Sequence, residues 1–209
     1  MKLLIFGATG GVGRQLVEQA LAQGHVVTAF ARDPAKLDLK HENLHVAQGD
    51  VMEAASVERA TRGQDAVLLA LGTPALTKNT VRSAGTRNVI RAMEKAGVRR
   101  LVCLSSIGIG DSRAMLPFHY KYILVPLLLR QGFAEHELQE NCVKQSHIQW
   151  TIVRPGSFTN GARTGTYRHG LPGSAMAIKA KISRADVADF MLKQLGENTY
   201  LHKTPWLSY

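Results

Sequence analysis

The 209-residue chain is poor in cysteine and contains no long apolar run. No stretch approaches the ~20 apolar residues that a membrane-spanning helix needs, so we expect no membrane partner. Cys103 and Cys142 match no metal-ligand spacing and suggest no disulfide framework. Met1-Lys2 leads directly into an apolar segment and leaves no room for a signal peptide. These absences predict a cytoplasmic protein with no metal site.

Acidic residues are few compared with basic ones. The chain has 26 Lys and Arg against 16 Asp and Glu, a formal net charge of +10, but the basic residues are scattered and aromatic residues make up only 6%. A nucleic-acid surface needs a basic stripe with aromatic platforms, so we expect no nucleic-acid partner. Scattered cations are typical of solvated helix faces. A cofactor with three phosphates and an anionic substrate would also favour them.

The first thirty residues predict a strand, a glycine turn, a helix and a second strand. An apolar run ends in Gly7-x-x-Gly10-x-x-Gly13, a helical pattern follows, and a second apolar run begins at His25. Gly7 would allow the tight turn, Gly10 would admit a pyrophosphate, and Gly13 would let the helix pack closely on the strand. The helix N-terminus also supplies free N–H groups, so Thr9, Gly11 and Val12 join the predicted cofactor site. The competing interpretation is a glycine-rich turn without a ligand.

The remaining chain continues the alternation of short apolar strands and helices. This order predicts an α/β fold: a Rossmann-like doubly wound parallel sheet with helices on both faces. We expect a single NAD(P)-binding domain over 1–209, with substrate-side loops in 106–135 and 156–177. Further strands are predicted at 44–48, 65–71, 100–105, 149–153 and 177–182, and helices at 54–61, 79–96, 118–146 (interrupted at Pro126 and Gly132) and 184–195 (capped by Ser183).

Ligands in such sheets bind beyond the carboxyl ends of the strands. That rule adds a set of strand-end residues to the predicted cofactor site: Asp50, Val51, Leu71, Gly72, Thr73, Ser105, Arg154 and Pro155. Asp50 and Val51 would meet the adenine, and Thr73 would approach a ribose or the nicotinamide. In the competing interpretation, Asp50 only caps the next helix and Thr73-Pro74 only turns the chain.

Arg32 indicates which dinucleotide is bound. NAD-selective sites carry an acidic residue after the second strand, whereas this chain has Ala31 and then Arg32. An arginine there binds a 2′-phosphate with charge-assisted hydrogen bonds, and Arg14 would assist from the first helical turn. We therefore predict NADP, with NADPH preferred over NADH. The alternative is a solvated arginine paired with Asp33.

The glycine spacing resembles that of the extended and atypical short-chain dehydrogenases/reductases. Members that reduce carbonyls use a tyrosine and a lysine four residues apart on one helix, but Leu124 follows Tyr120 and Pro126 follows Tyr122 at that spacing. Alcohol–ketone chemistry with a tyrosine acid is therefore not expected. Flavins and conjugated tetrapyrroles accept hydride with less help from a protein acid.

Two other features have no assigned role. The histidines His119, His136, His147 and His169 lack metal-like neighbours and receive no assignment. The leucine-rich run 123–129 is expected to form a buried, kinked helix over the substrate cleft. Its alternative is a patch for a membrane surface or a protein partner.

Motifs along nearly the whole chain resemble the atypical short-chain dehydrogenases with an NAD(P)H-binding, NmrA-like domain. The N-terminal and central ones are Gly7-Ala8-Thr9-Gly10, Arg32-Asp33, Gly49-Asp50-Val51, Ser105-Ser106 and Trp150 to Gly156. The C-terminal ones are similar to the biliverdin-IXβ reductase/flavin reductase group: Gly165-Thr166-Tyr167, Ile182 to Leu192 and Pro205 to Tyr209.

This resemblance implies NADPH-dependent reduction of a flavin or linear tetrapyrrole by a monomer or weak homodimer, with Ser106 as the active-site serine. The chain departs from that group at Gly156, where the group has a histidine, and in 107–135. No second phosphate-binding glycine turn is present, so flavin is expected as a substrate only. We predict an NAD(P)H-dependent oxidoreductase that transfers hydride to a flavin, quinone or tetrapyrrole-like acceptor. The alternative is an NmrA-type regulator that binds the dinucleotide without turnover.

Overall fold

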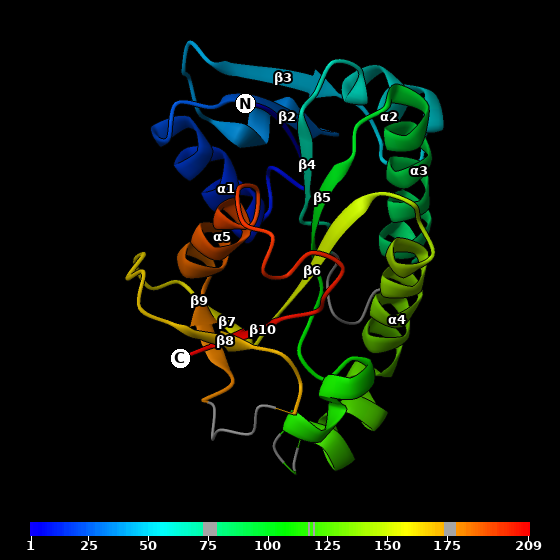
Figure 1. The fold of residues 1–209 in the computed structure, drawn as a ribbon, viewed down its shortest axis with the longest axis vertical. Helices are drawn as coiled ribbons and strands as arrows, with labels where there is room; N and C mark the ends of the chain where they lie inside the picture. The colour runs from blue at the N-terminus through cyan, green and yellow to red at the C-terminus, as the bar shows by residue number, and fades with distance from the viewer. Residues whose placement is uncertain (73–78, 117, 119, 174–178) are drawn as a thin grey trace.

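The computed structural model describes residues 1–72, 79–116, 118, 120–173 and 179–209. Its main sheet has eight strands in the order β3-β2-β1-β4-β5-β6-β10-β8, and only the β10–β8 pair is antiparallel (Figure 1). A separate two-stranded sheet pairs β7 with β9. The strand bounds are β1 Lys2–Phe6, β2 Val26–Ala31, β3 Leu44–Gln48, β4 Ala66–Leu69, β5 Arg100–Leu104, β6 Gln149–Pro155, β7 Ser157–Thr159, β8 Arg168–Gly170, β9 Lys181–Ser183 and β10 Trp206–Ser208.

Helices cover both faces of the main sheet (Figure 1). The α-helices are α1 Gly11–Ala22, α2 Ala54–Thr61, α3 Val81–Ala96, α4 Arg130–Lys144 and α5 Arg184–Lys193. Two 3₁₀ helices, η1 Pro34–Leu37 and η2 Gly110–Met115, and a π-helix, η3 Tyr120–Leu129, lie between them. The predicted doubly wound Rossmann-like fold is confirmed.

Strand alternation divides the core into two layers. On one face Leu3 and Ile5 of β1 pack with apolar residues of α1 and α5, and on the other Leu4 and Phe6 pack with those of α2, α3 and α4. These four side chains of β1 are fully buried. A strand buried on both sides explains why the sequence shows a continuous apolar run instead of alternation.

Most predicted elements are present with small changes at their ends. The helix 54–61 matches α2 in both bounds, β4 ends two residues before the predicted strand, and β6 extends two residues further. Ser183 caps α5 as expected, because its hydroxyl accepts the backbone N–H of Asp186 at 3.0 Å.

The segment 118–146 differs from its prediction in two ways. Gly132 lies inside α4 and does not interrupt it; the change of helix type comes at Leu129–Arg130 instead. A single helical glycine costs only about 1 kcal/mol relative to alanine, so tertiary packing tolerates it. The predicted burial of the leucine-rich run is also wrong in part.

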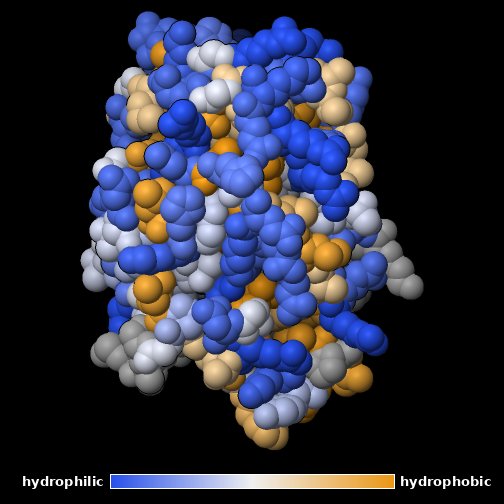
Figure 2. Space-filling view, turned by 45° about the vertical axis from the view of Figure 1, so that its right-hand side comes forward, coloured by the Kyte–Doolittle hydropathy of each residue, from blue (hydrophilic) through white to orange (hydrophobic). Residues whose placement is uncertain are grey.

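Three side chains of that run, Ile123, Leu127 and Leu128, are 51–75% exposed, and Val125 is buried against Ile107, Leu116 and Trp206. Apolar surface is visible at the lower end of the molecule in Figure 2. Among the η3 side chains that the structure describes, Val125 is thus buried, Lys121 and Leu129 are half-buried, and the others are exposed.

Candidate functional site

A cavity of about 840 Å³ opens beyond the carboxyl ends of β1, β2, β4, β5 and β6. One part is lined by the glycine turn and by the ends of β2, β3 and β4. The other part is lined by the segment after β5, by η3, α4 and the segment after β6. Of the predicted site residues, those that line it are Gly7, Thr9, Gly10, Gly11, Val12, Arg32, Asp50, Val51, Leu71, Gly72, Ser105, Ser106 and Pro155.

The three motif glycines have different structural roles. Gly7 has a φ of +76°, and a Cβ there would lie 2.2 Å from the carbonyl oxygen of Ala70. A Cβ on Gly13 would lie 1.9 Å from the Gly7 carbonyl oxygen, so α1 can approach β1 only with glycine at this position. Gly10 is the N-cap of α1 and lines the cavity, and a Cβ there would meet only the Gly7 carbonyl oxygen, at 3.2 Å. The open backbone at Gly10 and the α1 N-terminus fit a pyrophosphate.

The exposed guanidinium of Arg32 lines the cavity at the end of β2. The alternative pairing with Asp33 is not found: Asp33 lies 3.6 Å from Lys36 Nζ and accepts the Ala35 N–H. Arg14 instead pairs with Glu18 at 3.0 Å, within its own helix. Arg32 is therefore placed to meet an anionic group of a ligand in this part of the cavity.

Asp50 and Val51 line the cavity after β3. The Asp50 carboxylate accepts the Met52 N–H at 2.9 Å, whereas Glu53 is the N-cap of α2. Asp50 thus does not cap α2; it is half-buried, Val51 is buried, and both line the cavity. Thr73 lies outside the described residues.

Ser105 and Ser106 face different ways at the end of β5. The buried Ser105 hydroxyl donates to Glu140 Oε1 at 2.8 Å. The half-buried Ser106 hydroxyl donates to the Ile107 carbonyl oxygen at 3.1 Å and adjoins the cavity. Of the two, Ser106 has the more accessible hydroxyl for a bound molecule.

Arg154 does not line the cavity, which corrects its predicted role as a direct cofactor contact. Its side chain is fully buried and donates through Nε and Nη2 to Glu140 at 2.8 and 2.7 Å, and through Nη1 to Asp111. Burial disfavours the charged forms of both Arg154 and Glu140. Their mutual hydrogen bonds outweigh it, raising the pKa of Arg154 and lowering that of Glu140. This ion pair connects β6, α4 and η2 beneath the cavity.

His136 is a cavity residue to which the sequence prediction gives no role. It lies on α4, and its Nδ1 is 3.3 Å from Gln139 Oε1. Burial, with the nearby charge of Arg82, lowers its pKa to about 4. The one signal in the sequence is its position four residues before Glu140, which places both on one side of a helix.

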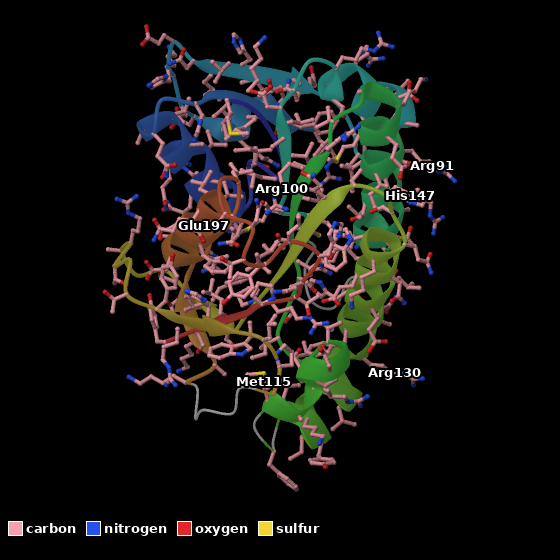
Figure 3. The ribbon with its side chains drawn as sticks, in the orientation of Figure 1. Arg91, Arg100, Met115, Arg130, His147 and Glu197 are labelled. Atoms are coloured by element: carbon pink, nitrogen blue, oxygen red, sulfur yellow. The ribbon has the colours of Figure 1, made fainter. Side chains whose placement is uncertain are left out.

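The other histidines that the structure describes do not line the cavity. His169 contacts Tyr200 Oη at 2.7 Å and packs against Phe190. His147 follows α4 at the end opposite to Met115 and Arg130 (Figure 3). His119 lies outside the described residues. In the described ranges, no group of three or more His, Cys, Asp and Glu residues could hold a metal ion. No helix in the described part of the chain has the length and apolar character to cross a bilayer.

Residues 7–198 match the family model for NAD(P)H-binding proteins, and the chain belongs to this family. The expected atypical short-chain dehydrogenase, NmrA-like class is confirmed. Among solved structures, a protein titled an anaerobillin reductase, ChuY from Escherichia coli O157:H7, is 26% identical with a TM-score of 0.79, and the match covers 100% of this chain and 97% of that one.

Two curated relatives match over most of this chain. A "(4-alkanoyl-5-oxo-2,5-dihydrofuran-3-yl)methyl phosphate reductase" from Streptomyces griseus is 31% identical over 89% of this chain and 57% of its own length. An uncharacterized chloroplastic protein from Arabidopsis thaliana is 33% identical over 78% of this chain and 61% of its own length. The chain thus spans about three fifths of the length of these relatives. Together with the fold, the comparisons define a member of the NAD(P)H-binding family with a Rossmann-like sheet.

Proposed function

We propose that the protein reduces a flavin, quinone or tetrapyrrole-like acceptor by hydride transfer from NADPH. The observation that carries this proposal is the continuity of one cavity. Its glycine-turn part fits a dinucleotide, and its other part is walled by Leu116, Leu129 and Phe133, which suit a planar apolar ring system. The reductase names of ChuY and the Streptomyces griseus relative support reduction as the reaction.

The residues of this chain would position the reactants. The α1 N-terminus and Gly10 hold the pyrophosphate, and Arg32 holds the 2′-phosphate. NADPH supplies the hydride when bound. Ser106, at the junction of the two parts of the cavity, orients the nicotinamide carboxamide or the acceptor through its hydroxyl. Flavin enters as a substrate, so the purified protein is expected to be colourless.

The cofactor preference is tested at Arg32. A guanidinium bonded to a 2′-phosphate contributes about 1.5–3 kcal/mol, a tenfold to hundredfold preference, and exposure favours the lower end. Arg32→Ala should weaken NADPH binding and leave NADH binding nearly unchanged, in titrations at one ionic strength. The exposed Arg14→Ala, which loses only the Glu18 pair, is the matched control. If Arg32→Ala weakened the binding of NADH and NADPH equally, Arg32 would not be the contact for the 2′-phosphate.

The function itself is tested by steady-state NADPH oxidation with FMN, FAD, quinones and biliverdin. We expect turnover with at least one acceptor, and Ser106→Ala should lower kcat more than it changes NADPH affinity. Ser105→Ala, which alters the buried neighbour instead, should act through stability. NADPH binding without turnover of any acceptor would contradict the proposal.

That outcome would favour the regulator alternative. The exposed side chains of η3, Ile123, Leu127 and Leu128, supply the partner surface that such a regulator needs. We propose that the reductase acts as a monomer or weak homodimer. It binds neither nucleic acid nor a membrane in this proposal. Gel filtration and light scattering test the oligomeric state.

A further inference from the structure

His136 brings a polar group into the apolar part of the cavity. It lies on α4, one turn after Phe133, and Leu116 and Leu129 line the same part. These neighbours offer no hydrogen bond through their side chains, and Arg82, which also lines the cavity, is only a donor. The imidazole is therefore a polar side chain among apolar neighbours in this part of the cavity.

A buried hydrogen-bond chain fixes the tautomer of this imidazole. Gln139, which is fully buried, donates through Nε2 to Thr86 Oγ1 of α3 at 3.2 Å. In the structure the same amide turns its oxygen toward His136, with Oε1 3.3 Å from Nδ1. An amide oxygen only accepts, so Nδ1 carries the proton. Nε2, on the opposite side of the ring, then keeps its lone pair.

The charges around His136 favour this neutral form. Burial is the larger cause and the positive charge of Arg82 on α3 adds to it, and together they lower the pKa of His136 to about 4. Glu140 acts in the other direction, but it is held by Arg154, Lys144 and Ser105.

Glu135 is likewise held by Ser83, whose N–H and hydroxyl donate at 3.2 and 2.9 Å. Neither acid forms an ion pair with His136 among the described residues. At neutral pH the ring is a hydrogen-bond acceptor, and it has no proton to donate from Nε2.

We propose that His136 Nε2 is the specificity-determining contact for the molecule that receives the hydride. It would bind acceptors that carry an N–H or O–H at the edge of a planar ring system, as flavins and pyrrole-containing tetrapyrroles do. Quinones without such a group would gain nothing from it. This inference rests on the proposed function and narrows its substrate class.

The test is an equilibrium titration of FMN, which has a ring N–H, and menadione, which has no N–H or O–H, into the protein with NADP⁺. We expect His136→Phe, which keeps a planar ring, to weaken FMN binding about threefold to tenfold and to leave menadione binding unchanged. His136→Gln retains an oxygen acceptor and should recover part of the FMN affinity. The NADP⁺ dissociation constant should stay constant in both.

A second variant distinguishes this role from packing. Gln139→Glu places a carboxylate beside Nδ1 and should raise the pKa of His136, followed by NMR, by about 1–3 units. FMN binding should then weaken as the pH falls through the new value, because Nε2 becomes protonated. Gln145→Glu, an exposed change at the other end of α4, should leave both unchanged.

Equal losses for FMN and menadione, or no loss of FMN binding in His136→Phe, would overturn the assignment. So would a wild type that binds neither compound. Because these readouts are affinities, they do not depend on turnover. A protein that binds FMN through His136 without oxidising NADPH would contradict the proposed function and leave the ligand contact in place.

Discussion

Replacing Glu140 by glutamine should cost far more stability than any surface ion pair in the described structure. The side chains of Arg154 and Glu140 are 0% and 1% exposed, and two hydrogen bonds of 2.8 and 2.7 Å join them. Glutamine keeps the shape, but it removes the negative charge that compensates a buried guanidinium. In either orientation its amide N–H₂ also has to face a donor of Arg154.

The magnitude follows from the burial. Breaking a buried pair by removing one partner costs about 3–5 kcal/mol. Asp111, 63% exposed, still holds Arg154 at Nη1, so we expect the lower end, about 3 kcal/mol. For a chain of this length that corresponds to a Tm lower by about 6–12 °C.

Denaturant unfolding at pH 7 measures this change directly. The control is Glu58→Gln, which removes the exposed pair with Lys95 (2.6 Å) and should cost less than about 1 kcal/mol. The double variant Glu140→Leu with Arg154→Met should be more stable than Glu140→Leu alone, because no buried charge is left without its partner: Asp111 and Lys144, which lose theirs, reach solvent. A Glu140→Gln variant no less stable than Glu58→Gln would refute the reasoning.

Two further predictions follow from the same structure. Gly10→Val should fold and lose NADPH binding in calorimetry, since its Cβ meets only the Gly7 carbonyl oxygen at 3.2 Å; Gly13→Val should fail to fold, because its Cβ would lie 1.9 Å from that oxygen. Unchanged NADPH affinity in folded Gly10→Val would contradict the phosphate site. The second prediction concerns the pH dependence of stability. The pKa of His136 is about 4 in the folded state, below its unfolded value of about 6.5, so the unfolded state binds more protons between these pH values. Wild-type stability should therefore fall by about 1–3 kcal/mol more than that of His136→Phe as the pH drops from 6.5 to 4. Parallel pH profiles would show that His136 is not buried neutral.

The parts of the fold that could be predicted are those with local patterns. The glycine turn, α2 and the Ser183 cap each depend on residues within a few positions of one another, and the structure places them as expected. Six of the eight residues that the strand-end rule added to the site line the cavity, because parallel strands share one carboxyl edge.

The failures concern contacts that connect distant segments. Arg154 is predicted to follow the strand 149–153, but it lies inside β6 and its partner Glu140 lies on the preceding helix, so its side chain turns inward and not toward a ligand. The role of His136 could not be predicted, because it depends on Gln139 and, through it, on Thr86 of a different helix. The leucine-rich run suggested burial, although Ile123, Leu127 and Leu128 are exposed and Val125 is buried against a small apolar cluster.

A crystal structure of the NADP⁺ complex tests the central claim most directly. We predict the pyrophosphate at the α1 N-terminus beside Gly10, the 2′-phosphate on Arg32, and the nicotinamide ring beside Ser106, facing the part of the cavity that His136 lines. A nicotinamide directed away from Ser106, or a pyrophosphate away from Gly10, would contradict the account.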